Sequence, residues 1–253
     1  MGILAMNAAA ERGAGTGWAI AAGAGVMLLG GPLLGLVNGS VIVLGRVAPF
    51  IVTLGTMAAY RAIILHQAEG AEVRSMVSAF GDLGSGGVRL PFLLSSRGVP
   101  VLVGVPTLCF LGVVVLGEAV LRLTVLGRHV LAVGGNAEAA RYAGIGVGKV
   151  TMVVYTLCGL TCGVAALLNA SRLNSVASSS LGQMYELDAI AAVVIGGTAM
   201  AGGRGSVLGT LVGVLLLGVI NNMLTMLSVD NYIQGLVKGC IIIGAVLLQR
   251  TRR

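Results

Sequence analysis

The chain has 253 residues, of which 57% are apolar and only 10% are Asp, Glu, Lys or Arg, and its mean hydropathy is +0.99. A soluble domain carries about 25% charged residues, so this composition excludes a soluble fold and predicts an integral membrane protein. The net charge of +7 does not indicate nucleic acid, because bases gather in cytoplasmic loops of membrane proteins and no basic stretch here is interleaved with aromatic residues.

Residues 1–12 do not resemble a signal peptide, because no basic segment precedes their apolar residues. A helix needs about 20 apolar residues to cross the hydrocarbon, so runs without charged residues mark the spans. The runs are 13–45, 47–60, 98–117, 150–171, 189–203, 205–229 and 231–249, the last interrupted only by Lys238. They predict an all-α, polytopic transmembrane helical bundle of about seven membrane segments, in which residues 1–253 form a single membrane-spanning domain.

Three of these runs have unusual lengths. The first is too long for one straight span, and Gly30-Gly31-Pro32 predicts a break or kink within it. The 47–60 run is short, and it extends through residues 63–65 if Arg61 snorkels or faces protein. The 189–203 run is too short for a comfortable crossing, which predicts a half-helix or a re-entrant element packed inside protein.

The distribution of bases predicts which loops face the cytoplasm. The loops around Arg46, at 122–149 and around Arg204, and the tail after Leu248, carry most of the bases and are expected on the cytoplasmic side. The opposite side carries most of the acids. It includes residues 66–98, which read as an external loop with short ordered pieces.

The loop at about 126–149 contains the pattern E-A-A-x3-G, from Glu138 to Gly144. Asn136 is a good N-cap for a short helix, and Gly144 can end that helix. Such a helix, placed between two spans, offers a surface that another protein can bind. An ordinary connector explains the pattern equally well from physics alone.

Polar residues inside the predicted spans are a further candidate set, because polar groups in hydrocarbon face protein, water or substrate. They are Asn38, Asn169, Asn221, Asn222, Gln234 and Lys238. A translocation path and plain hydrogen bonding between helices both account for them. Glycines at i, i+4 and i+8 of the 205–229 run, namely Gly205, Gly209 and Gly213, predict close helix packing.

No motif for catalysis, metal binding or a cofactor is found. His66 and His129 are far apart, and Cys158 and Cys162 have no companion ligand, so the cysteines read as small apolar packing residues. A phosphate-binding G-x4-G-K-[ST] loop is also missing. The chain is therefore not expected to be an enzyme, and ATP-driven transport would need an ATPase on a separate chain.

Residues 36–248 resemble the ribose-type permeases of bacterial ABC importers. The similarity is carried by PFIVTLGTMAAYRAI at 49–63, LGRHVLAVGGNAEAARYAGI at 126–145, the long block at 185–213, and the Asn221-Asn222 pair. The resemblance implies a permease subunit that moves a monosaccharide or similar small polar solute into the cell. It also implies that the E-A-A-x3-G loop is the helix that couples to the ATPase, through Gly135, Asn136, Glu138, Ala139, Ala140, Arg141 and Gly144.

The partners that the resemblance implies are a cytoplasmic ABC ATPase, a second permease copy or paralogue, and a periplasmic or lipid-anchored sugar-binding protein. The chain would lie in the bacterial inner membrane, with no nucleic acid and no cofactor. Members usually have earlier helices with a G-G-x-D-L-S-x-G element, which is not matched here, so we expect the chain as given to start late.

Two alternatives remain open. A branched-chain amino-acid permease of the same superfamily is one, although the 185–213 block favours sugars. A stand-alone secondary transporter is the other. It would need intramembrane carboxylates for ion coupling, and Glu118 is the only acid well within a span.

Overall fold

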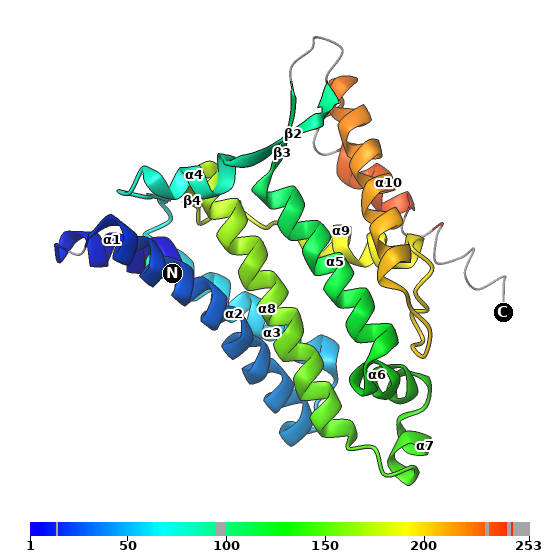
Figure 1. The fold of residues 1–253 in the computed structure, drawn as a ribbon. Coiled ribbons are helices and arrows are strands. Elements are labelled where there is room, and N and C mark those ends of the chain that lie inside the picture. The colour runs from blue at the N-terminus through cyan, green and yellow to red at the C-terminus, as the bar shows by residue number, and fades with distance from the viewer. Residues whose placement is uncertain (14, 95–99, 231–232, 242–243, 245–253) are drawn as a thin grey trace. The chain divides into compact units, whose positions relative to one another are not determined.

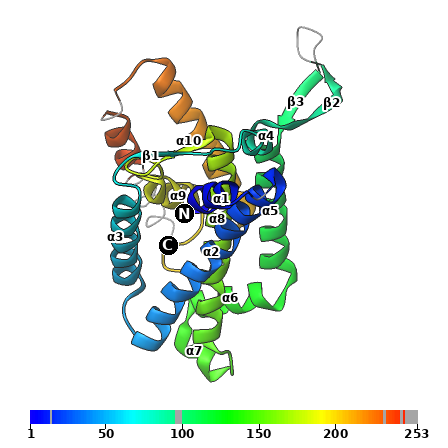
Figure 2. The same ribbon diagram turned by 90° about the vertical axis from the view of Figure 1, so that its left-hand side faces the viewer.

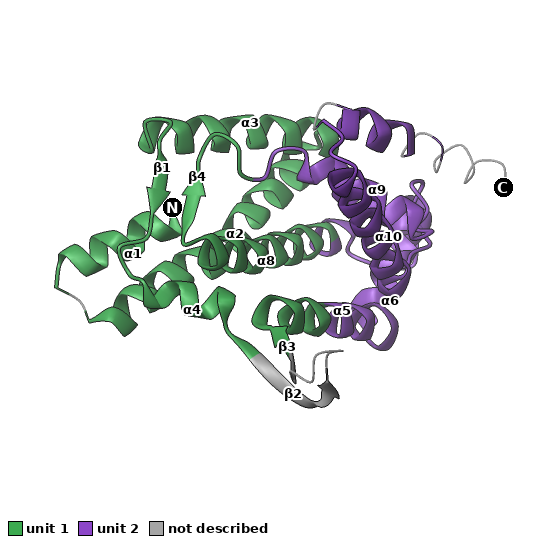
Figure 3. Cartoon of the chain, turned by 90° about the horizontal axis from the view of Figure 1, so that it is seen from above, with its two compact units in different colours: residues 1–113, 151–181 green, residues 114–150, 182–253 purple. Residues whose placement is uncertain are grey.

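The computed structural model describes residues 1–13, 15–94, 100–230, 233–241 and 244 (Figure 1). The chain divides into two compact units (Figure 3). Unit 1 comprises Met1–Val113 and Thr151–Leu181, and unit 2 comprises Val114–Val150 and Gly182–Arg253. Each unit is described by itself below.

Helices dominate both units. They are α1 (Gly2–Glu11), α2 (Thr16–Gly45), α3 (Pro49–Gln67), α4 (Ala79–Ser85), α5 (Val105–Leu123), α6 (Val125–Gly135), α7 (Ala137–Tyr142), α8 (Val147–Leu173), α9 (Tyr185–Ile195) and α10 (Val207–Met226). Among the described residues, α2, α3, α5, α8 and α10 are long and apolar enough to cross a membrane. The prediction of an all-α polytopic membrane protein is therefore confirmed.

Several predicted span boundaries need correction. The break expected at Gly30-Gly31-Pro32 is wrong, because α2 continues as one α-helix with Pro32 inside it. The 98–117 span instead begins at Val105, because residues 100–104 form strand β3 of a hairpin, and it continues to Leu123. The extension of the 47–60 run is confirmed, since α3 reaches Gln67. The 231–249 span lies partly outside the described residues, of which 233–241 are helical.

In unit 1, α2 and α8 approach each other through glycines. Gly31 and Gly35 lie so close to the backbone of Gly159 and Tyr155 that a β-carbon at either position would overlap a carbonyl group. Such contacts need small residues, and they replace the hydrophobic driving force that lipid cannot supply between helices. These contacts lie on both sides of Pro32, within the unbroken helix α2.

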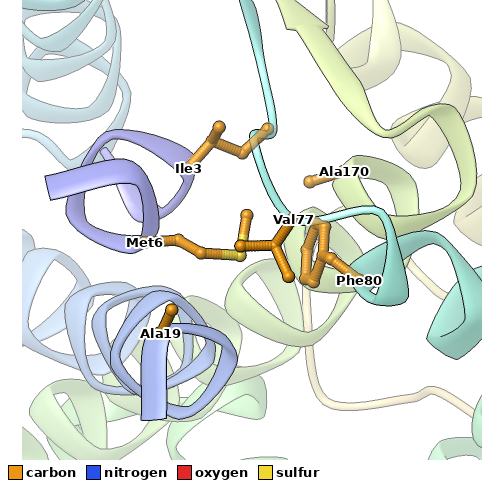
Figure 4. Packing of buried hydrophobic residues seen from close by; sticks show 6 residues of the cluster. All are labelled: Ile3, Met6, Ala19, Val77, Phe80 and Ala170. Atoms are coloured by element: carbon orange, nitrogen blue, oxygen red, sulfur yellow. The ribbon is translucent and has the colours of Figure 1, made fainter. Parts of the chain in front are cut away.

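A small side-chain core lies at the end of unit 1 that contains α1 (Figure 4). Its buried residues are Ile3, Met6, Ala19, Val77, Phe80 and Ala170, contributed by α1, α2, α4, α8 and the segment before α4. Asn7 adds two hydrogen bonds, donating to the Arg74 carbonyl at 2.8 Å and accepting from the Met76 amide at 3.0 Å. The core ties α1 to the predicted external loop.

Two short antiparallel strand pairs give this loop its order, one of them labelled in Figure 2 and the other in Figure 3. β1 (Glu72–Arg74) pairs with β4 (Ser175–Ala177), and β2 (Gly87–Leu94) pairs with β3 (Pro100–Gly104). The short ordered pieces predicted within 66–98 are thus present. The β1–β4 pairing also joins this loop to the segment after α8, which the charge pattern places on the same side of the membrane.

In unit 2, α9 is a half-helix packed against α10. Its 11 residues span about 16 Å at 1.5 Å per residue, which is half of a hydrocarbon core of about 30 Å. Ala191, Ala192 and Leu217 form its buried core with α10. The prediction of a half-helix packed inside protein agrees with this geometry.

Candidate functional site

The candidate coupling loop starts with a tight corner between α5 and α6. The Thr124 hydroxyl oxygen donates to the Val120 carbonyl at 2.6 Å and accepts from the Gly127 amide at 3.2 Å, so one side chain satisfies both helix ends. Gly127 lies so close to Leu121 that no β-carbon fits there. These contacts fix the direction in which α6 leaves α5.

The short helix α7 has the caps that its sequence predicts. The Asn136 side-chain oxygen accepts hydrogen bonds from the Glu138 and Ala139 amides, each at 3.0 Å. At the other end Gly144 adopts φ +80°, and the Ile145 amide donates to the Ala140 carbonyl at 3.0 Å. This is the left-handed glycine termination typical of helix ends, and it gives the six-residue helix hydrogen-bonded caps at both ends.

Burial divides α7 into an anchor and an open surface. Ala140 is 4% exposed and is its one buried residue, whereas Tyr142 is 91% exposed. The other residues predicted to contact the ATPase are also exposed, namely Gly135, Asn136, Glu138, Ala139, Arg141 and Gly144. A capped helix with an exposed aromatic side chain and charges of both signs is suited to binding another protein.

The end of α6 packs directly on the loop between α9 and α10. A β-carbon at Gly134 would lie 2.9 Å from the Gly203 nitrogen, and one at Gly203 would lie 2.8 Å from the Gly135 α-carbon. Gly202 and Gly203 have φ values of +87° and +77°, which favour glycine for a second reason. This contact agrees with the charge pattern, which places the 122–149 loop and the Arg204 loop on one side.

Glu118 was not among the predicted site residues. Its Oε2 accepts hydrogen bonds from the backbone amides of Val207 at 2.9 Å and Leu208 at 3.3 Å, at the first turn of α10. Arg122, one turn later on α5, forms an ion pair with the same carboxylate. The sequence did contain a signal for this contact: Glu118 is an acid within an apolar run, and a base, Arg122, follows four residues later.

The predicted translocation residues fall in both units. Asn169 belongs to unit 1, where it donates to the Ala165 carbonyl at 3.1 Å, whereas the other three belong to unit 2. Asn221 is half-buried, Asn222 is exposed, and the Gln234 amide donates to the Val229 carbonyl at 2.8 Å. Hydrogen bonding within a helix therefore accounts for part of this set.

Lys238 has a specific partner within unit 2. Its Nζ lies 3.0 Å from Oδ2 of Asp188 in the first turn of α9. An ammonium group near apolar surroundings needs such a partner, because burying an unpaired charge is costly. Both side chains are partly exposed, and the pair joins the half-helix to the last described helical residues.

The three predicted packing glycines have two different roles. Gly209 and Gly213 lie on α10 against Gly196, the residue that ends α9, and Ala192 within α9, as close helix packing requires. Gly205 is not on the helix, because the Ser206 side chain caps α10 by accepting from the Gly209 amide at 3.2 Å. The i, i+4, i+8 spacing predicted that all three glycines share one helix face. Ser206 was not recognised from the sequence as the cap, after which the helix begins.

A shallow groove of about 340 Å³ lies beside these contacts in unit 2. Its walls include Leu121, Val130, Leu131, Thr198, Arg204 and Thr210. Within the described part of the chain no group of three or more His, Cys, Asp or Glu residues could hold a metal ion. All four cysteines are free thiols.

The fold and the site define a class: a multi-pass membrane protein in which a short, capped and exposed helix joins two spans. A family model described as the permease component of the branched-chain amino acid transport system matches residues 2–246. The chain belongs to this family of permeases.

Curated relatives of the chain are sugar import permeases by name. The ribose import permease protein of Bacillus subtilis (strain 168) is 40% identical over 215 residues, covering 85% of this chain and 63% of that protein. The ribose import permease protein of Escherichia coli (strain K12) is 40% identical over 226 residues, covering 88% and 67%. The galactose/methyl galactoside import permease protein of the same strain is 39% identical over 222 residues, covering 86% and 63%.

The chain therefore spans roughly two thirds of the length of these relatives, as 63% to 67% coverage shows. No solved structure matches it.

Proposed function

We propose that this chain is the membrane-spanning subunit of an ATP-driven importer for a monosaccharide in the bacterial inner membrane. The observation that carries the proposal is α7, a capped and largely exposed helix between α6 and α8 in the chain. A permease without its own nucleotide site must receive force through a surface of this kind. The names of the relatives, which import ribose or galactosides, support a sugar as the solute.

The proposed partners follow from the same argument. A cytoplasmic ATPase would bind the open side of α7, where Glu138 and Arg141 offer charges of both signs for hydrogen-bonded ion pairs. A second permease copy would complete the sugar path, and a sugar-binding protein would deliver the solute on the opposite side. The chain itself would perform no chemistry on the sugar.

Solute uptake tests the proposal directly. Proteoliposomes that contain the chain, its ATPase and a ribose-type binding protein should accumulate radiolabelled ribose or galactose when ATP is supplied inside. Leucine should not be accumulated when a leucine-binding protein replaces the sugar-binding protein. Leucine uptake without sugar uptake would overturn the proposal in favour of the amino-acid alternative.

Membrane topology provides a second test, because α7 must face the cytoplasm to meet an ATPase. Single cysteines at Ala137 and at Ser85, in a background without the four native cysteines, should react differently with an impermeant thiol reagent. We expect the residue-85 cysteine to be labelled in intact cells and the residue-137 cysteine only after permeabilisation. The opposite pattern would mean that α7 cannot contact a cytoplasmic ATPase.

A further inference from the structure

The first turn of α10 is held by a carboxylate from another helix. Glu118 on α5 accepts from the Val207 amide at 2.9 Å and from the Leu208 amide at 3.3 Å, and its side chain is only 13% exposed. These two amides belong to the group that a helix leaves without partners at its start. Within unit 2, the contact therefore joins the last part of α5 to the start of α10 through one side chain.

A charge at this position needs several compensating groups. An ionised carboxylate in apolar surroundings is costly unless it is paired and hydrogen-bonded. The α10 amides supply two hydrogen bonds, the helix dipole supplies about half a positive charge, and Arg122 supplies a full one. This arrangement is stable only while α10 stays against α5, so Glu118 acts as an electrostatic tie between them.

A second contact lies at the other end of the same corner. The α6 backbone at Gly134 touches the backbone at Gly202 and Gly203. Within this loop the Ala199 amide donates to the Arg204 carbonyl at 3.0 Å, which closes residues 199–204 into a compact turn. Asn136 is the residue that ends α6 and also caps the start of α7. Because only this residue separates the two helices, a displacement of α7 would move the end of α6 and, through it, the 199–204 turn.

Together these contacts form a closed ring. α5 continues into α6, α6 packs on the 199–204 turn, the turn leads into α10, and Glu118 joins α10 back to α5. With all four contacts made, these elements are expected to move together. If the Glu118 contact is lost, α6 can move without α10. Glu118, with its ion-pair partner Arg122, supplies the charge-dependent contact of this ring.

We propose that Glu118 is a positioning residue for transport, which ties α10 to α5 so that movement of α7 reaches the α9–α10 pair. The inference rests on the proposed function and extends it from the ATPase-binding surface to the inside of the spans. It assigns a role to Glu118, to the Gly134–Gly203 contact and to the 199–204 turn.

The test measures how many sugar molecules enter per ATP hydrolysed, in proteoliposomes that hold the whole complex. Glu118→Gln keeps the shape of the side chain but removes its charge and leaves Arg122 unpaired. We expect the ratio to fall at least about fivefold, the lower end of typical coupling between sites. Basal ATP hydrolysis, measured without binding protein, should stay unchanged. Glu118→Asp, which keeps the charge, should retain more coupling than Glu118→Gln.

A matched control separates this role from a structural one. Glu186 is an exposed carboxylate in the first turn of α9, and Glu186→Gln removes one negative charge from the same unit. It should leave the ratio at the wild-type value. Thermal midpoint and yield are measured for every variant, because a contact needed only for folding would lower these and leave the ratio unchanged.

A crosslink provides the rescue experiment. A β-carbon at Gly117 would lie 3.5 Å and 3.6 Å from the two γ-carbons of Val207, so cysteines at these two positions would have their side chains in contact and can be tested for a disulfide. The cysteines are introduced by Gly117→Cys and Val207→Cys into the Glu118→Gln variant from which the native cysteines have been removed. These two cysteines should form a disulfide. Oxidation should restore the ratio, and reduction should remove it again.

The outcomes distinguish failure of the inference about Glu118 from failure of the proposed transport function. An unchanged ratio in Glu118→Gln would overturn the inference, as would a disulfide that forms without restoring coupling. Failure of the disulfide to form while Glu118 is present would contradict the α5–α10 contact itself. A wild-type complex that hydrolyses ATP but carries no sugar would overturn the proposed function, and the inference with it.

Discussion

The two units hold their loops by different means. In unit 1 the α1 corner, defined as α1, residues 72–80 and Ala170, is a core of side chains in which Met6 and Phe80 are fully buried. In unit 2 the α10 corner, defined as the end of α5, α6, residues 196–206 and the first turn of α10, is held by backbone contacts at glycines and by the Glu118 carboxylate.

This difference indicates different tolerances to change. A side-chain core loses stability in proportion to the volume removed, and its neighbours can partly fill the space. A backbone contact at glycine admits no added carbon atom, and a charge contact is either made or broken. The α1 corner is therefore expected to tolerate graded changes in side-chain volume, and the α10 corner is expected to respond sharply to the loss of one contact.

The largest effect is expected at Gly144, which connects the α10 corner to the proposed ATPase. Gly144→Val forces a branched side chain into φ +80° at the end of α7, and we expect sugar uptake to be lost. Gly182→Val is the matched control, since Gly182 also has φ +80° and neither glycine has a neighbour that a β-carbon would meet.

Uptake per folded complex separates the two glycines. The strain is the same in both variants, so only contact with a partner distinguishes them. We expect near-normal uptake in Gly182→Val and none in Gly144→Val, with both inserted in the membrane. Equal losses would mean that backbone strain, and not the ATPase surface, explains the requirement for glycine.

The next largest effect tests the α1 corner. Phe80→Ala removes a fully buried ring, and we expect the free energy of unfolding to fall by about 3–5 kcal/mol. Thermal unfolding in detergent measures this loss, and Phe50→Ala, at a side chain that is 71% exposed, is the control. Sugar uptake per ATP hydrolysed should not change. A change in that ratio would mean that this corner also affects coupling.

A smaller effect is expected where α9 meets α10. Gly213→Ala would place a β-carbon 2.9 Å from the Ala192 carbonyl carbon and 3.1 Å from the Gly196 nitrogen, so the two helices must separate. We expect a loss of about 1–3 kcal/mol in the free energy of unfolding. Gly218→Ala meets nothing within 4 Å and should be neutral or slightly stabilising, because alanine favours a helix. Equal thermal midpoints for the two variants would contradict the packing.

Much of the fold follows from one property of the sequence, the spacing of charged residues along an apolar chain. It predicted the spans, the half-helix α9 and the long loop at 66–98. It misplaced the start of α5, because the apolar residues of β3 read like the start of a span. It also predicted a break or kink at Gly30-Gly31-Pro32, and no break is present, because α2 continues as one helix with Pro32 inside it.

The candidate site could be predicted from the sequence where its structure depends on hydrogen bonds between residues that are close in the chain. Asn136 and Gly144 act within five residues of their partners, so the caps of α7 could be read directly. Glu118 could not, because its partners are 89 and 90 residues away. Only the three-dimensional arrangement shows that this acid meets the start of α10, and the same is true of Gly134 and Gly203.

The smallest effect concerns the β1–β4 pair beside the α1 corner. A hydrogen bond from Ser175 and, next, the charge of Arg74 hold the pKa of Glu72 below its usual value of 4.5. Because the folded-state pKa is lowered, this contribution to stability is present above about pH 4.5 and is lost as the pH falls through the folded value. The group is fully exposed, so solvent screening keeps the contribution small.

Glu72→Gln removes the titrating group and should flatten this part of the pH dependence. Between pH 6 and pH 3.5 the thermal midpoint of the wild type should fall slightly more than that of Glu72→Gln. Glu69→Gln, which changes a neighbouring exposed carboxylate, should follow the wild type. If Glu72→Gln loses as much as the wild type, the strand pair is held by its backbone hydrogen bonds alone. The loop beside the α1 corner would then owe its order to strand pairing and side-chain packing, without the charge contact that the α10 corner uses.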